Sequence, residues 1–74
     1  MSLPIGDEIE RRAVAAVERG ELVTCSSERW PAVRRTLQDQ AGKWIDTGQG
    51  IKAVIALREV ERLDREFDYH LGMP

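Results

Sequence analysis

The sequence predicts an all-α protein of three helices, and two observations carry that prediction. Apolar residues recur at helical spacing in three segments, each followed by glycine, and only residues 21–25 have the composition of a strand. The predicted helices cover residues 7–19, 28–45 and 51–70 of a single 74-residue domain. The second and third helices are expected to form an antiparallel hairpin.

The first predicted helix has one apolar face and a clear end. Ile9, Ala13, Ala16 and Val17 recur at the spacing of neighbours on a helix, and Gly20 follows the last predicted turn. Residues 21–25 after it are too few for an independent strand and form either a connector or an edge strand. Ser26 and Ser27 are suitable N-caps for the next helix.

The second predicted helix carries one apolar stripe about four turns long. Its members are Trp30, Val33, Leu37, Ala41 and Trp44. Pro31 fits only in the first turn, because proline has no N–H for an internal helical hydrogen bond. Two glycines within residues 46–50 end the helix and predict the turn of the hairpin.

The third predicted helix is apolar nearly all round at its start and charged outside its stripe later. The stripe consists of Ala53, Ala56, Val60, Leu63, Phe67 and His70. Ile51, Val54 and Ile55 lie away from this stripe. The later acidic and basic residues, which include Glu59, Arg62 and Asp64, are expected on a solvated face.

Size and composition predict self-association. A chain of 74 residues buries only roughly 60% of its unfolded surface, which does little more than offset the conformational entropy lost on folding. A single cysteine cannot form an internal disulfide. We therefore expect a symmetric homodimer through the third helix. The expected interface residues are Ile51, Val54, Ile55, Val60, Leu63 and Phe67.

The candidate reactive groups do not predict an enzyme. Cys25 and His70 are the only thiol and the only imidazole, and they lie on different predicted elements. Neither has a sequence signature of a catalytic triad or of a metal site. The segment Gly48-Gln49-Gly50 lacks the lysine and the preceding strand of a phosphate-binding loop. We expect no catalytic residues, no metal and no cofactor.

The favoured function is a non-catalytic, protein-binding module that regulates or inhibits a partner protein. Tryptophan and arginine are enriched at binding hot spots, and Trp30, Arg29 and Arg34 cluster at one end of the second helix. The same tryptophan stripe could instead be core, and the sequence leaves both interpretations open. Small acidic helical proteins of this kind are common among regulators, inhibitors and adaptors, including those of phages and mobile elements.

A small dimeric DNA-binding regulator is the alternative. Residues 22–25 could form the strand of a ribbon-helix-helix protein, and a degenerate helix-turn-helix can be placed on residues 34–53, with Arg34 and Arg35 at phosphates. The ribbon, however, lacks residues that reach base edges. The formal net charge of −2 also gives no overall attraction for nucleic acid or anionic membranes. With no membrane-spanning run and no secretory signal, we expect a cytoplasmic protein.

Overall fold

The structure, a computed structural model, describes residues 5–69 and is all-helical. It contains α1 (Ile5–Arg19), α2 (Trp30–Asp46) and α3 (Gly50–Glu66), and no strand forms within the described range. This confirms the predicted all-α class and the three helices. Residues 20–29, which join α1 to α2, are called the connector below.

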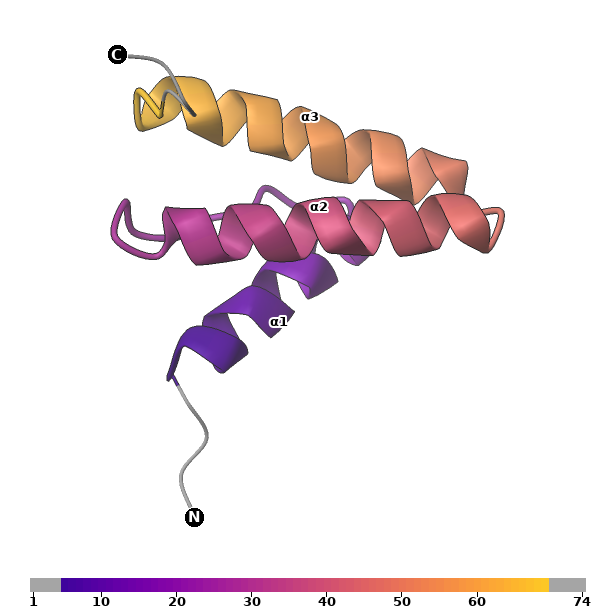
Figure 1. Cartoon of the computed structure of the whole chain (residues 1–74), viewed down its shortest axis with the longest axis horizontal. Helices are drawn as coiled ribbons and strands as arrows, with labels where there is room; N and C mark the ends of the chain where they lie inside the picture. Colours follow the sequence, from indigo (N-terminus) through magenta and orange to yellow (C-terminus); the bar gives the residue numbers. More distant parts are fainter. Residues whose placement is uncertain (1–4, 70–74) are drawn as a thin grey trace.

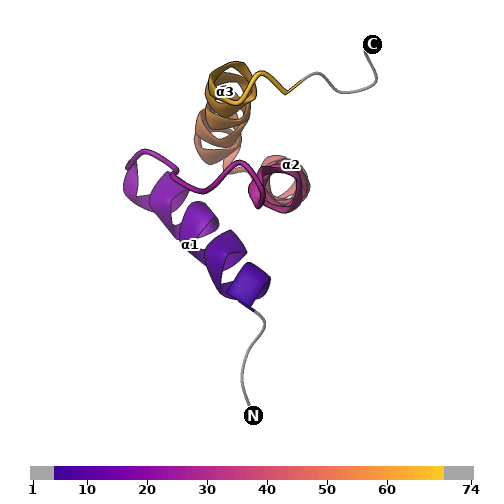
Figure 2. The same cartoon turned by 90° about the vertical axis from the view of Figure 1, so that its left-hand side faces the viewer.

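The helices α2 and α3 form an antiparallel hairpin, and α1 crosses beneath it (Figure 1). The α2–α3 pair makes the most extensive packing in the molecule, and α1 packs mainly against α2. Turned by 90°, the structure shows the connector running between α1 and α3 on its way to the start of α2 (Figure 2).

A single core lies where the three helices meet, and the predicted stripes supply it. Its buried members are Ala13, Val17, Val23, Trp30, Val33, Leu37, Ala41, Trp44, Ala53, Ala56, Val60 and Leu63. All five residues of the predicted α2 stripe are buried. Both tryptophans are therefore core residues, which settles the alternative that the sequence left open.

The first two helices end as the glycines predict. Gly20 adopts a φ of 73°, and the N–H of Glu21 donates to the carbonyl of Ala16 over 2.8 Å. Gly48 adopts a φ of 78°, after which the N–H of Gln49 donates to the carbonyl of Trp44. Both glycines take the left-handed conformation that closes a helix C-terminus.

The start of α2 differs from its prediction. Residues 27–29 form a turn, and the N-cap is Arg29 without a side-chain capping bond, so neither serine has the expected role. The N–H of Arg29 and that of Trp30 instead donate to the carbonyls of Ser26 and Ser27. Proline occupies the first turn, as its lack of an N–H requires.

The end of α3 also differs, because the helix stops four residues before the predicted boundary. Asp68 has a φ of 51°, and the N–H of Tyr69 donates to the carbonyl of Asp64 over 2.8 Å. This reversal brings Phe67 against Trp30, with ring centroids 6.0 Å apart. His70, the last member of the predicted stripe, lies outside the described residues.

Candidate functional site

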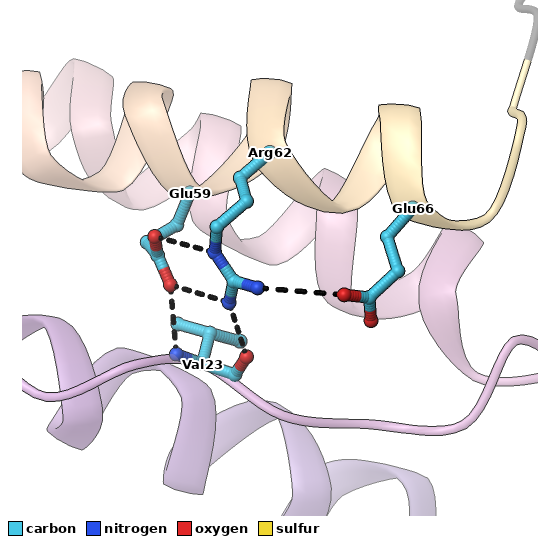
Figure 3. A network of polar contacts seen from close by, with 4 residues as sticks. All are labelled: Val23, Glu59, Arg62 and Glu66. Carbon is cyan, nitrogen blue, oxygen red and sulfur yellow. Dashed lines mark hydrogen bonds and ion pairs between the residues drawn. The ribbon is translucent and has the colours of Figure 1, made fainter.

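A polar clamp fixes the connector to α3 (Figure 3). The N–H of Val23 donates to Glu59 Oε1 over 2.8 Å, and Arg62 Nη2 donates to the carbonyl oxygen of Val23 over 2.8 Å. Arg62 also pairs with the carboxylate of Glu59 through Nε and Nη2, at 3.0 and 2.9 Å. The guanidinium and the carboxylate thus satisfy both backbone groups of Val23, whose side chain is buried.

The clamp corrects the expected solvated face of α3, because Glu59 is buried. Hydrogen bonds from Arg62 lower the pKa of Glu59, with smaller contributions in the same direction from the Val23 N–H and the Arg62 charge, and burial acts in the opposite direction. The same pairing raises the pKa of Arg62. Both groups are therefore charged at neutral pH, and they have a structural role.

A second polar cluster ties the start of α2 to the end of α3. The indole Nε1 of Trp30 donates to Asp64 Oδ1 over 2.7 Å, and Arg34 Nε donates to both oxygens of that carboxylate over 3.1 Å. The guanidinium of Arg34 also lies over the ring of Tyr69, 5.3 Å from its centroid. These contacts hold the hairpin closed at the end opposite its turn.

This cluster shows where the predicted partner-binding residues lie. Trp30 is 0% exposed and Arg34 is largely buried by its pairing with Asp64, so the two do not form an exposed aromatic patch. Arg29 is exposed. The helical spacing placed Trp30 and Arg34 on adjoining turns correctly, but only the packing of α3 reveals that they are covered.

The two arginines of the DNA-binding alternative differ in their surroundings. Arg35 is exposed, whereas Arg34 is engaged with Asp64. The clamp already occupies both backbone groups of Val23, one of the four residues that the DNA-binding alternative assigns to the ribbon.

The outer side of α3 presents an aliphatic face, which we define as Ile51, Val54 and Leu57. Ile51 is 80% exposed, Val54 54% and Leu57 45%, and these three positions cover successive parts of the first two turns. Ile45, in the last turn of α2 beside the hairpin turn, is exposed as well. Single exposed aliphatic residues are ordinary, whereas these three lie on adjoining turns and form one apolar patch.

The aliphatic face contains only part of the predicted dimer interface. Ile51 and Val54 are exposed as expected, and Ile55 is half-buried against the core. Val60 and Leu63 are buried within the chain itself, and Phe67 packs on Trp30, because the predicted stripe faces α2. The predicted interface lacked Leu57, which lies one turn after Val54 on the solvent side of the helix.

A hollow of about 830 Å³ lies between α1 and the connector. Small residues of α1, Ala15 and Ala16, line it together with Leu22, Thr24 and Cys25 of the connector. Burial, with a smaller contribution from the charge of Glu66, raises the pKa of the Cys25 thiol. The thiol is thus protonated at neutral pH, which does not favour nucleophilic chemistry.

Within the part of the chain that is described, no cluster of three or more histidine, cysteine or acidic side chains could hold a metal ion. Over the same residues, no helix has the length and apolar character that crossing a membrane requires. No protein-family model, curated protein or solved structure matches the chain. The surfaces described above are therefore the basis for its proposed function.

Proposed function

We propose that this protein is a non-catalytic interaction module that regulates or inhibits a partner protein and works as a homodimer paired through the aliphatic face of α3. The observation that carries the proposal is the exposure of Ile51, Val54 and Leu57 on two adjoining turns. Large aliphatic side chains are stabilised by removal from water, and this chain leaves them uncovered.

The spacing of the aliphatic face suits a twofold axis. When two copies of α3 pair antiparallel about an axis at Val54, the two Val54 side chains meet each other. Ile51 of each copy then meets Leu57 of the other, because the two lie three residues on either side of the axis. A self-complementary apolar contact of this kind is what an isologous dimer requires.

The area of the aliphatic face agrees with this role. With Ile45, the exposed surface of these residues is on the order of 400 Å², the size of the largest apolar patch on a typical protein, and such patches are often functional. A standard interface buries roughly 800 Å² on each partner, of which a little over half is apolar. The patch would thus supply most of the apolar part of a small dimer interface.

An acidic residue in the aliphatic face tests this pairing. We expect Ile51→Glu to abolish self-association, because two unpaired carboxylates would be buried at the contact. In the wild-type protein the melting temperature should rise with protein concentration, since dissociation accompanies unfolding. In Ile51→Glu it should be independent of concentration.

The matched control is Leu22→Glu, which makes the same apolar-to-acidic change at an exposed connector position. This variant should keep the concentration dependence of the wild type. If Leu22→Glu abolishes it and Ile51→Glu does not, the pairing surface is not on α3.

A further inference from the structure

We infer that Arg58 of each copy forms an ion pair with Asp46 of the other copy, and that these two pairs fix the antiparallel arrangement of the dimer. This inference rests on the proposed function, which supplies the second copy and the axis at Val54. It adds the charged groups that determine which way the two aliphatic faces meet.

Arg58 lies on the same side of α3 as the aliphatic face. It follows Ile51 by seven residues and Val54 by four, and both are spacings of neighbours along one side of a helix. Its side chain is exposed. Among residues 5–69 it forms no hydrogen bond, ion pair or ring contact. The guanidinium is therefore available to a group of a second copy.

Asp46 is an acid that lacks a cation in its own chain. It is exposed and is the last residue of α2, where the free carbonyls of the helix carry partial negative charge and disfavour a carboxylate. Within the described range its side chain forms no ion pair, not even with Lys43, the nearest cation along the sequence. A cation from a second copy would stabilise this end of α2.

The antiparallel pairing brings Arg58 and Asp46 of different copies to the same place. With the axis at Val54, Arg58 of one copy lies opposite Gly50 of the other, because both are four residues from the axis. Gly50 begins α3, and only the turn of residues 47–49 separates it from Asp46 (Figure 1). The long side chain of Arg58 thus extends at the hairpin turn of the other copy, where Asp46 lies.

A parallel pairing of the two helices would bring like charges together. Each residue would then meet its own counterpart, so the exposed Arg58, Glu61 and Arg65 would each face an identical charge. Glu61 and Arg65 pair within one chain at 3.8 Å, so the repulsion would be greatest at Arg58. In the antiparallel pairing, Glu61 lies opposite Thr47 and meets no acid. The charges after the aliphatic face therefore favour the antiparallel arrangement.

Charge reversal tests the ion pair, with sedimentation equilibrium of the full chain at low salt as the measurement. Arg58→Glu and Asp46→Arg should each raise the dissociation constant of the dimer about tenfold. An exposed ion pair contributes up to about a factor of five, and each variant reverses two pairs in the dimer. Both effects should decrease at high salt, which screens exposed charges.

An equimolar mixture of the two variants is the decisive sample. In the mixed dimer, the introduced glutamate of one copy meets the introduced arginine of the other, and Arg58 still meets Asp46 at the second contact. The mixture should therefore dimerise with about the affinity of the wild type, although neither variant does so alone. Such complementation requires contact between copies, and a misfolded variant could not produce it.

The matched controls are Arg35→Glu and Asp39→Arg, which make the same charge changes at exposed positions of α2 away from the hairpin turn. Both should dimerise as the wild type does. A mixture no tighter than its components would overturn the inference, and so would an Asp46→Arg variant that dimerises normally while Arg58→Glu does not, since that is the result of a parallel pairing. A wild-type protein that stays monomeric contradicts the proposed dimer as well, whereas a wild-type dimer with unaffected variants contradicts only the ion pairs.

Discussion

At the scale of single residues, the fold depends on two carboxylates, the buried Glu59 and the half-buried Asp64, that join segments far apart in the sequence. Glu59 receives the N–H of Val23, and Asp64 receives the indole of Trp30. Each also pairs with an arginine, Glu59 with Arg62 and Asp64 with Arg34. Hydrogen bonds to charged, partly buried groups are among the stronger polar contributions to stability.

Glu59→Gln should lower the free energy of unfolding by about 1–3 kcal/mol, because Arg62 and the Val23 N–H lose their buried charged acceptor, and Arg62 keeps only the more distant Glu66, 3.7 Å away, as an ion-pair partner. Urea denaturation monitored by circular dichroism measures the change. The exposed Glu61→Gln, two residues further along the same helix, is the control and should change stability little. Equal effects of the two substitutions would contradict the role of the clamp.

The clamp also predicts an acid sensitivity. The pKa of Glu59 is lower in the folded protein than the ordinary value of about 4.3 for an unfolded chain. The unfolded state therefore binds the proton first as the pH falls. The stability from this group is fully present above the unfolded pKa and is lost as the pH falls toward the folded pKa.

Unfolding free energies measured from pH 6 to pH 2 would test this sign. The wild type should lose more stability than Glu59→Gln below about pH 4.3, so that the two curves converge in acid. Parallel curves would show that the Glu59 carboxylate does not contribute.

The sequence could not identify these carboxylates. Glu59 and Asp64 stand among Glu61, Arg62 and Arg65 in a pattern typical of an exposed helix face. Their helical positions border the apolar stripe, and a side chain at such a border is buried or solvated according to what packs beside it. Here the connector covers Glu59 and α2 covers Asp64, and neither neighbour is encoded by local spacing.

At the scale of elements, periodicity predicted the helices well and their ends less well. The stripe from Trp30 to Trp44 became the core face of α2, since a run of four turns has one consistent buried side. The predicted end of α3 lies too far along the chain, because apolar residues continue at helical spacing through Phe67. The chain reverses there through Asp68, a residue that no helix-stop rule singles out.

Two glycines, one inside a helix and one at a helix end, test how backbone conformation contributes to the stability of the helices. Gly42 lies inside α2 with open space where a Cβ would stand, so Gly42→Ala should raise stability by about 0.5–1 kcal/mol through better helix propensity. Gly48 also has open space but a φ of 78°, so Gly48→Ala should lower stability by about 1 kcal/mol through backbone strain.

Thermal denaturation of both variants measures these effects. A Cβ added at either glycine has no neighbouring atom within 4 Å. The opposite effects of the two substitutions are therefore expected from the backbone conformation at each site. Destabilisation by Gly42→Ala would mean that its face of α2 is covered by a second molecule.

At the scale of the whole molecule, the sequence predicted surplus apolar surface at the start of α3, and the structure leaves Ile51 and Val54 exposed there. The sequence does not separate this surface from the core seam, which is why the predicted interface includes Val60 and Leu63, both buried in the structure. One helix can have two apolar sides, and only the position of α2 decides which of them is internal. The hollow between α1 and the connector had no sequence signal, because it forms only where these two segments pack together.

The mass of the wild-type protein in solution tests the central claim most directly. Sedimentation equilibrium over a range of concentrations should show a reversible monomer–dimer equilibrium, with the Ile51→Glu variant at the mass of one chain throughout. A wild-type protein that stays at the mass of one chain at every concentration, with the aliphatic face of α3 exposed to water, would contradict the account.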